Sequence, residues 1–138
     1  MPKYICIAVM LLFVPGCGSE PFPRAAVKGK VTFDGQPISK GTILFVPTGG
    51  NSEGAASAEI LEGNYQLPRR QGPAVGTHQV QVLAMRNNGK IEAGPPHPPG
   101  TLVEDIQQYI PARYNHQSEL KEELKPGENT LDFTWLKE

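Results

Sequence analysis

Residues 27–33 read VKGKVTF, and this stretch decides the fold because polar and apolar side chains alternate along it. Successive side chains of an extended strand point to opposite faces of a sheet, so every second residue shares a face. Val27, Val31 and Phe33 therefore lie on one face, and the two lysines and the threonine lie on the other. The pattern predicts a strand with one face buried and one face in water.

Six further stretches favour extended backbone, and turn signals such as Asp34-Gly35 separate them at intervals of about ten residues. The chain contains 15 glycines and 14 prolines, which favours turns over long helices. The seven predicted strands cover residues 27–33, 42–47, 58–61, 65–67, 78–85, 118–125 and 129–135. Together they predict an all-β domain, a single seven-stranded antiparallel β-sandwich of Greek-key type.

One of these strands, residues 118–125, also fits a helix that pairs Leu120 with Leu124. We favour a strand because residues 129–135 need a partner and a turn joins the two segments, although a strand places Glu122 inward. The alternating faces also predict which large side chains form the core. These are Phe45, Tyr65, Val80, Val82, Phe133 and Trp135.

A short helix is predicted over residues 101–110, in the long segment before the last two strands. Residues 101–104, TLVE, fit a capping box, in which the threonine and glutamate side chains cap exposed amides. Apolar residues then recur at helical spacing, and Pro111 ends the segment. A helix of two to three turns is marginal alone, so we expect it to pack against the sheets.

The best candidate for a binding surface is the long segment 87–111, because loops of this length in compact domains are usually functional or disordered. Residues 87–100 read NNGKIEAGPPHPPG and are predicted to form a loop that projects from the domain. Its proline cluster offers a rigid, exposed surface at low entropic cost. A loop without function is the alternative. The cluster consists of Pro95, Pro96, His97, Pro98 and Pro99.

Composition argues against several classes of function. The net charge of −1, without a basic patch, argues against nucleic-acid binding. His78, His97 and His116 stand in separate surroundings without the short spacing typical of metal ligands, so we expect no metal site. Because no Ser–His–Asp grouping, phosphate loop or paired-carboxylate site is visible, we expect no catalytic residues and no cofactor.

The N-terminus reads as an export signal. Lys3 precedes the apolar run 4–14, YICIAVMLLFV, which is shorter than the roughly 20 residues that cross a bilayer as a helix. Residues 14–17, VPGC, resemble the lipobox of bacterial lipoproteins, although Pro15 departs from the small residue usual there. An ordinary secretory signal is the alternative.

The lipobox resemblance implies that residues 1–16 are a signal peptide and that Cys17 carries the lipid anchor. Residues 17–26 then form a tether, and residues 27–138 form the β-sandwich domain. Cys6 leaves with the signal, so the domain contains no cysteine and no disulfide. We therefore expect a membrane-anchored lipoprotein of the cell envelope.

Several motifs resemble the carboxypeptidase regulatory-like domain, which has a transthyretin-like sandwich. They are VKGKVTFDGQPI at 27–38, GTILFVP at 41–47, GNYQL at 63–67 and GTHQVQV at 76–82. With IPARY at 110–114, the chain is also similar to small lipoproteins of planctomycete-type bacteria. This resemblance implies an accessory, structural or ligand-binding module rather than a particular chemistry.

The expected function is a lipid-anchored, non-enzymatic envelope module with a structural role or a protein or glycan partner. The alternative is a small-molecule hydrolase, because the transthyretin-like fold includes 5-hydroxyisourate hydrolases. Those enzymes end in a tyrosine–arginine–glycine–serine motif, whereas residues 134–138 read TWLKE. The missing motif argues against the hydrolase.

We expect Cys17→Ser to abolish acylation and to move the protein from the membrane fraction to the soluble fraction or the medium. The reason is that stable anchoring requires two or more acyl chains, which only the acylated cysteine supplies. Incorporation of labelled fatty acid into the wild type and the variant checks this prediction. A wild type that takes up no label would contradict the lipoprotein interpretation.

Overall fold

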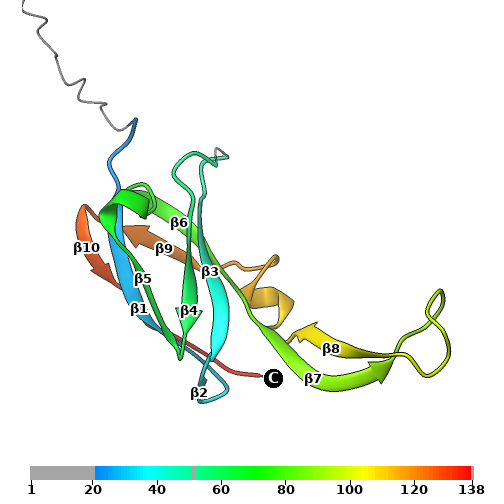
Figure 1. The fold of residues 1–138 in the computed structure, drawn as a ribbon. Coiled ribbons are helices and arrows are strands. Elements are labelled where there is room, and N and C mark those ends of the chain that lie inside the picture. Colours follow the sequence, from blue (N-terminus) through cyan, green and yellow to red (C-terminus); the bar gives the residue numbers. More distant parts are fainter. Residues whose placement is uncertain (1–20, 51, 138) are drawn as a thin grey trace, which may run out of the picture.

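The structure is all-β, as predicted. This computed structural model describes residues 21–50 and 52–137 (Figure 1). The predicted signal peptide, residues 1–16, and Cys17 lie outside the described residues. The elements in chain order are β1 (Ala25–Phe33), β2 (Gln36–Pro37), β3 (Lys40–Pro47), β4 (Ala56–Leu61), β5 (Asn64–Leu67), η1 (Arg69–Gln71), β6 (Gly76–Leu83), β7 (Met85–Glu92), β8 (Leu102–Gln108), η2 (Ala112–Tyr114), β9 (Lys121–Leu124), β10 (Gly127–Thr130) and β11 (Phe133–Trp135).

The strand count differs from the predicted seven, because the described residues form eleven strands. Strand β1 also begins within the predicted tether, at Ala25. The Ala25 amide donates to the Pro73 carbonyl at 2.8 Å, and Arg24 donates to the Gly72 carbonyl at 2.7 Å. These bonds to the loop before β6 hold the start of β1 on the domain, so residues 25 and 26 belong to a strand.

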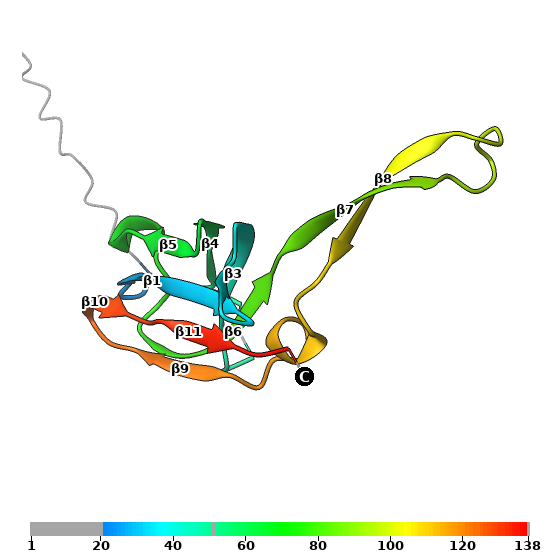
Figure 2. The ribbon, with the colours of Figure 1, turned by 90° about the horizontal axis from the view of Figure 1, so that it is seen from below.

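The main sheet has the order β10-β1-β5-β4-β3-β6-β9, and β1 pairs with more strands than any other strand of this sheet. Strands β2 and β11 pair with the second half of β1. Most pairs are antiparallel, but β10 and β11 run parallel to β1. The end strands β9 and β10 are consecutive in the chain, so the sheet curls around one core (Figure 2).

The predicted strand over residues 118–125 is confirmed for Lys121–Leu124, but its predicted pairing with the last strand is wrong. Strand β9 pairs with β6, and the last two strands pair with β1. The side chain of Asn129 explains why the chain passes from β9 to a pairing with β1. It accepts a hydrogen bond from the Lys125 amide and donates one to the Lys125 carbonyl, each at 2.9 Å. It also donates to the Ala26 carbonyl at 3.2 Å. The turn is therefore fastened to β1 rather than to β9.

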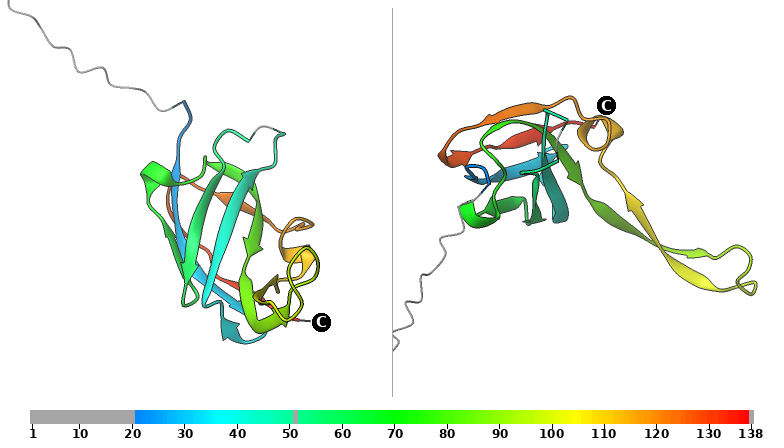
Figure 3. Two further views of the ribbon diagram at one scale, coloured as in Figure 1. Left: turned by 45° about the vertical axis from the view of Figure 1, so that its right-hand side comes forward. Right: turned by 90° about the horizontal axis from the view of Figure 1, so that it is seen from above.

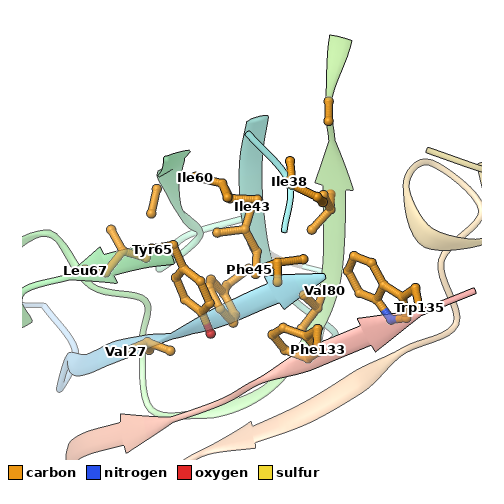
Figure 4. Packing of buried hydrophobic residues seen from close by; sticks show 14 of the residues in the cluster. Val27, Ile38, Ile43, Phe45, Ile60, Tyr65, Leu67, Val80, Phe133 and Trp135 are labelled. Carbon is orange, nitrogen blue, oxygen red and sulfur yellow. The ribbon is translucent and has the colours of Figure 1, made fainter. Parts of the chain in front are cut away.

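The predicted core is confirmed, because all six predicted side chains are buried (Figure 4). Phe133 lies between Tyr65 and Trp135, with ring centroids 6.5 Å and 5.5 Å away. The Tyr65 hydroxyl donates to the Leu131 carbonyl at 2.7 Å, so its polar atom has a partner. Burial raises the pKa of this phenol well above its usual range, and the carboxylates of Asp132 and Glu122 add to the shift.

Gly29 of β1 lies against the segment that joins β10 to β11. A Cβ atom at this position would lie 1.8 Å from the Leu131 carbonyl oxygen. On either side of the contact, the Leu131 amide donates to the Lys28 carbonyl at 2.9 Å, and Asp132 accepts from the Lys30 amide at 2.8 Å. Only glycine lets the two backbones approach this closely.

The predicted helix over residues 101–110 is wrong, because Leu102–Gln108 form strand β8. This strand pairs with β7, so part of the predicted loop 87–100 is also strand. The Thr101 hydroxyl donates backward to the Pro98 carbonyl at 2.7 Å instead of capping a helix. Apart from η2, a single 3-10 turn, residues 87–120 contain no helix. Pairing with β7 satisfies the backbone without the tertiary packing that a short helix needs.

We expect Phe133→Ala to lower the free energy of unfolding by about 3–5 kcal/mol, because the substitution leaves a cavity between two rings. Phe45→Ala should have an effect of similar size, since Phe45 is fully buried. Chemical denaturation measures both changes, and Thr134→Ala on the exposed side of β11 is the control. An unfolding curve unchanged by Phe133→Ala would contradict the assignment of the buried face.

We expect Gly29→Ala to destabilise the domain by about 1–3 kcal/mol or more, because the added methyl group forces β1 and Leu131 apart. Gly49→Ala is the matched control, since a Cβ atom there meets no atom within 4 Å. Denaturation midpoints compare the two variants. Equal midpoints would show that the backbones do not approach as described.

Candidate functional site

An arm formed by β7 and β8 projects from the body of the domain (Figure 3). The two strands pair only with each other, from Met85 opposite Gln108 to Glu92 opposite Leu102. At the far end, the Ala93 amide donates to the Thr101 carbonyl at 2.7 Å. The arm is therefore a separate two-stranded sheet, of a kind that is at best marginally stable alone in water.

Large apolar side chains are exposed on both faces of the arm. Directly paired residues share a face, so Ile91 and Val103 lie on one side. Leu102 and Ile106 lie on the other side, with exposed fractions of 62% and 52%. Ile91 is 51% exposed. Side chains of this size gathered on a projecting element indicate a surface for interaction.

The predicted binding residues Pro95, Pro96, His97, Pro98 and Pro99 lie together at the tip of the arm, and all five are exposed. The turn is closed by the His97 amide, which donates to the Gly94 carbonyl at 3.2 Å. The Gly100 amide donates to the Glu92 carboxylate at 2.7 Å. The tip is thus an ordered continuation of the two strands, and its role in binding stays a prediction.

The three histidines occupy different parts of the structure. His78 is 1% exposed on β6, whereas His97 at the tip and His116 after η2 are exposed. The Nδ1 atom of His78 lies 3.1 Å from the Gly76 carbonyl, and its Nε2 atom has no hydrogen-bond partner among the described residues. Across residues 21–50 and 52–137, no group of three His, Cys, Asp or Glu side chains is placed to hold a metal ion.

A cleft of about 500 Å³ lies at the root of the arm. Its floor and walls come from the end of β1, from β2, from the start of β3 and from the root of β7. The C-terminal segment completes it. The lining residues are Phe33, Asp34, Gln36, Pro37, Ser39, Lys40, Met85, Arg86, Asn87, Tyr109 and Lys137.

The aromatic part of this cleft is fixed by stacking. The Arg86 guanidinium lies 4.3 Å from the centre of the Tyr109 ring, a cation–π contact. Tyr109 in turn meets Phe33 edge to face, with the ring centres 5.8 Å apart. Burial raises the pKa of the Tyr109 hydroxyl, and the positive charge of Arg86 opposes this shift. The stack thereby holds a cation in the lining of the cleft.

Sequence reasoning missed the cleft, because its cations Lys40, Arg86 and Lys137 are far apart in the chain. They line one cleft only because β11 pairs with the second half of β1 and the arm leaves the body beside β2. Neither the pairing of β11 with β1 nor the position of the arm has a local signal in the sequence. The Asp34-Gly35 turn was visible in the sequence, but only as a turn between strands.

Comparison with known proteins leaves the family open. No protein-family model matches the chain, and neither a curated protein nor a solved structure matches it. Within the described part of the chain, no helix is long and apolar enough to span a membrane.

Proposed function

We propose that the chain is a lipid-anchored, non-enzymatic module of the cell envelope that binds a protein or glycan partner through its arm. One observation carries this proposal, namely a two-stranded arm that leaves the core with large apolar side chains exposed on both faces. Burying such a side chain stabilises a complex by about 1.5–3 kcal/mol. Leu102 and Ile106 on one face of the arm, and Ile91 on the other, are the side chains that a partner would bury.

The sequence motifs support the remaining parts of the proposal. The VPGC stretch at 14–17 favours acylation of Cys17, which would hold the domain at a membrane surface. The motifs around β1, β3 and β5 favour membership of the carboxypeptidase regulatory-like domains and a transthyretin-like sandwich. A core enclosed between β1 and β11 on one side and β3 and β6 on the other is compatible with such a sandwich.

The tip has the properties of a recognition element. Four prolines restrict the backbone before any partner binds, so less conformational entropy is lost in the complex. The tip continues directly into the paired strands β7 and β8, which form the shaft of the arm. A partner at Pro98 and Pro99 would therefore also reach Leu102. We therefore assign the tip to specificity and the apolar shaft to affinity.

We expect replacement of residues 94–100 by Asn-Gly to leave the body folded, because this pair forms a two-residue hairpin turn. Loop shortening changes closure entropy by about 1 kcal/mol or less. Photo-crosslinking from position 102 in intact cells should lose its products in this variant, and in a variant with Ile91→Ser and Ile106→Ser.

Leu61→Ser is the matched control, since Leu61 is an exposed apolar residue on β4, outside the arm. It should leave the crosslinked products unchanged. Products that persist in both arm variants would contradict the proposal. Loss of folding on tip replacement would show that the tip supports the body instead.

A further inference from the structure

The cleft at the root of the arm has a charge opposite to that of the whole chain. Lys40, Arg86 and Lys137 line it with three positive charges, and Asp34 supplies one negative charge, a net of +2. The full chain carries a formal net charge of −1. Cations gathered in a concave site raise the local concentration of anions. The cleft is therefore suited to an anionic ligand.

Two of the three cations are available to a ligand. Among the described residues, Arg86 and Lys137 have neither a carboxylate partner nor a side-chain hydrogen bond. The stack on Tyr109 fixes Arg86, so its planar donors are positioned in advance. Lys40 is shared, because its ammonium lies 3.8 Å from Glu59 on the neighbouring strand.

The rest of the lining fits a hydroxylated ring rather than a bare inorganic anion. Met85, Phe33 and Tyr109 contribute apolar lining, while Gln36 supplies an amide. Asn87 accepts from the Gly89 amide at 2.9 Å through its oxygen, which leaves its NH₂ group for a ligand. Asp34 would repel a bare oxyanion but would accept hydrogen bonds from ligand hydroxyls.

We propose that this cleft binds a carboxylate-bearing saccharide. The carboxylate pairs with Arg86 and Lys137, one sugar ring lies along the apolar lining, and hydroxyl groups bond to Asp34 and the two amides. A volume of about 500 Å³ lies within the range of known small-ligand sites. This site goes beyond the proposed function, since it requires neither the tip nor the partner of the arm.

The experiment is calorimetric titration of the full chain, in non-ionic detergent, with the trisaccharide of galacturonic acid. Its methyl ester is the neutral control, and inorganic phosphate is the second anion. We expect the acid to bind and the ester to bind at least about tenfold more weakly, because a hydrogen bond to a charged group contributes about 1.5–3 kcal/mol. Phosphate should not displace the trisaccharide at equal concentration.

Arg86→Gln and Lys137→Gln should each weaken binding of the acid by about tenfold. Lys137 is exposed near the C-terminus, so its variant tests the site without a risk to folding. Arg70→Gln is the matched control, since Arg70 is exposed in η1, at the opposite end of the body from β2 (Figure 1). The Asn-Gly tip variant retains the whole lining and should bind like the wild type.

Three results would overturn this inference. They are equal binding of acid and ester, unchanged binding in Lys137→Gln, and displacement of the trisaccharide by equimolar phosphate. Displacement would show a site for oxyanions alone. Loss of binding in the tip variant would instead place the ligand on the arm.

Discussion

The fold depends on one close approach between two backbones, at Gly29 and Leu131. The Leu131 carbonyl occupies the space that a Cβ atom of Gly29 would need, and it accepts the hydrogen bond of the buried Tyr65 hydroxyl. Without that approach, β10 and β11 could not both run parallel to β1 on either side of the contact. The interior would then lose Phe133 and Trp135, and Tyr65 would lose the acceptor that compensates for its burial.

The same approach positions the cleft. Because β11 pairs with the second half of β1, the chain after Trp135 runs beside the Asp34-Gly35 turn and brings Lys137 to it. The arm reaches the cleft from the other direction. Its root is fastened by the Tyr109 amide, which donates to the Ala84 carbonyl at 3.1 Å, and by the Ala84 amide, which donates to the Gln108 side chain at 3.0 Å. The cleft therefore lies between the turn that ends β1 and the root of the arm that follows β6.

The sequence predicts the parts of this structure that depend on local alternation. The period-two pattern of β1 identifies its buried face, and it does the same for Phe133 and Trp135. It fails for residues 101–110, because Leu102 and Ile106 share a face both at helical spacing and along a strand. Only the partner strand β7 decides between the two, and its exposed residues carry no apolar alternation. The sequence does not predict the cleft for a related reason, since only long-range strand pairing places Lys40, Arg86 and Lys137 in one lining.

The arm and the body differ in how they are stabilised, and this difference bears on function. The body rests on a shared core. The described contacts of the arm with that core lie at its root, where Ala84 and Ile110 are buried and Tyr109 packs against the core cluster. An element with so few buried contacts opens at a lower free energy than the core. In the proposed complex, the partner would order β7 and β8 as it binds, at a cost in conformational entropy. The prolines of the tip would reduce that cost, so the proposed function divides the arm into a restricted tip and two loosely held strands with complementary roles.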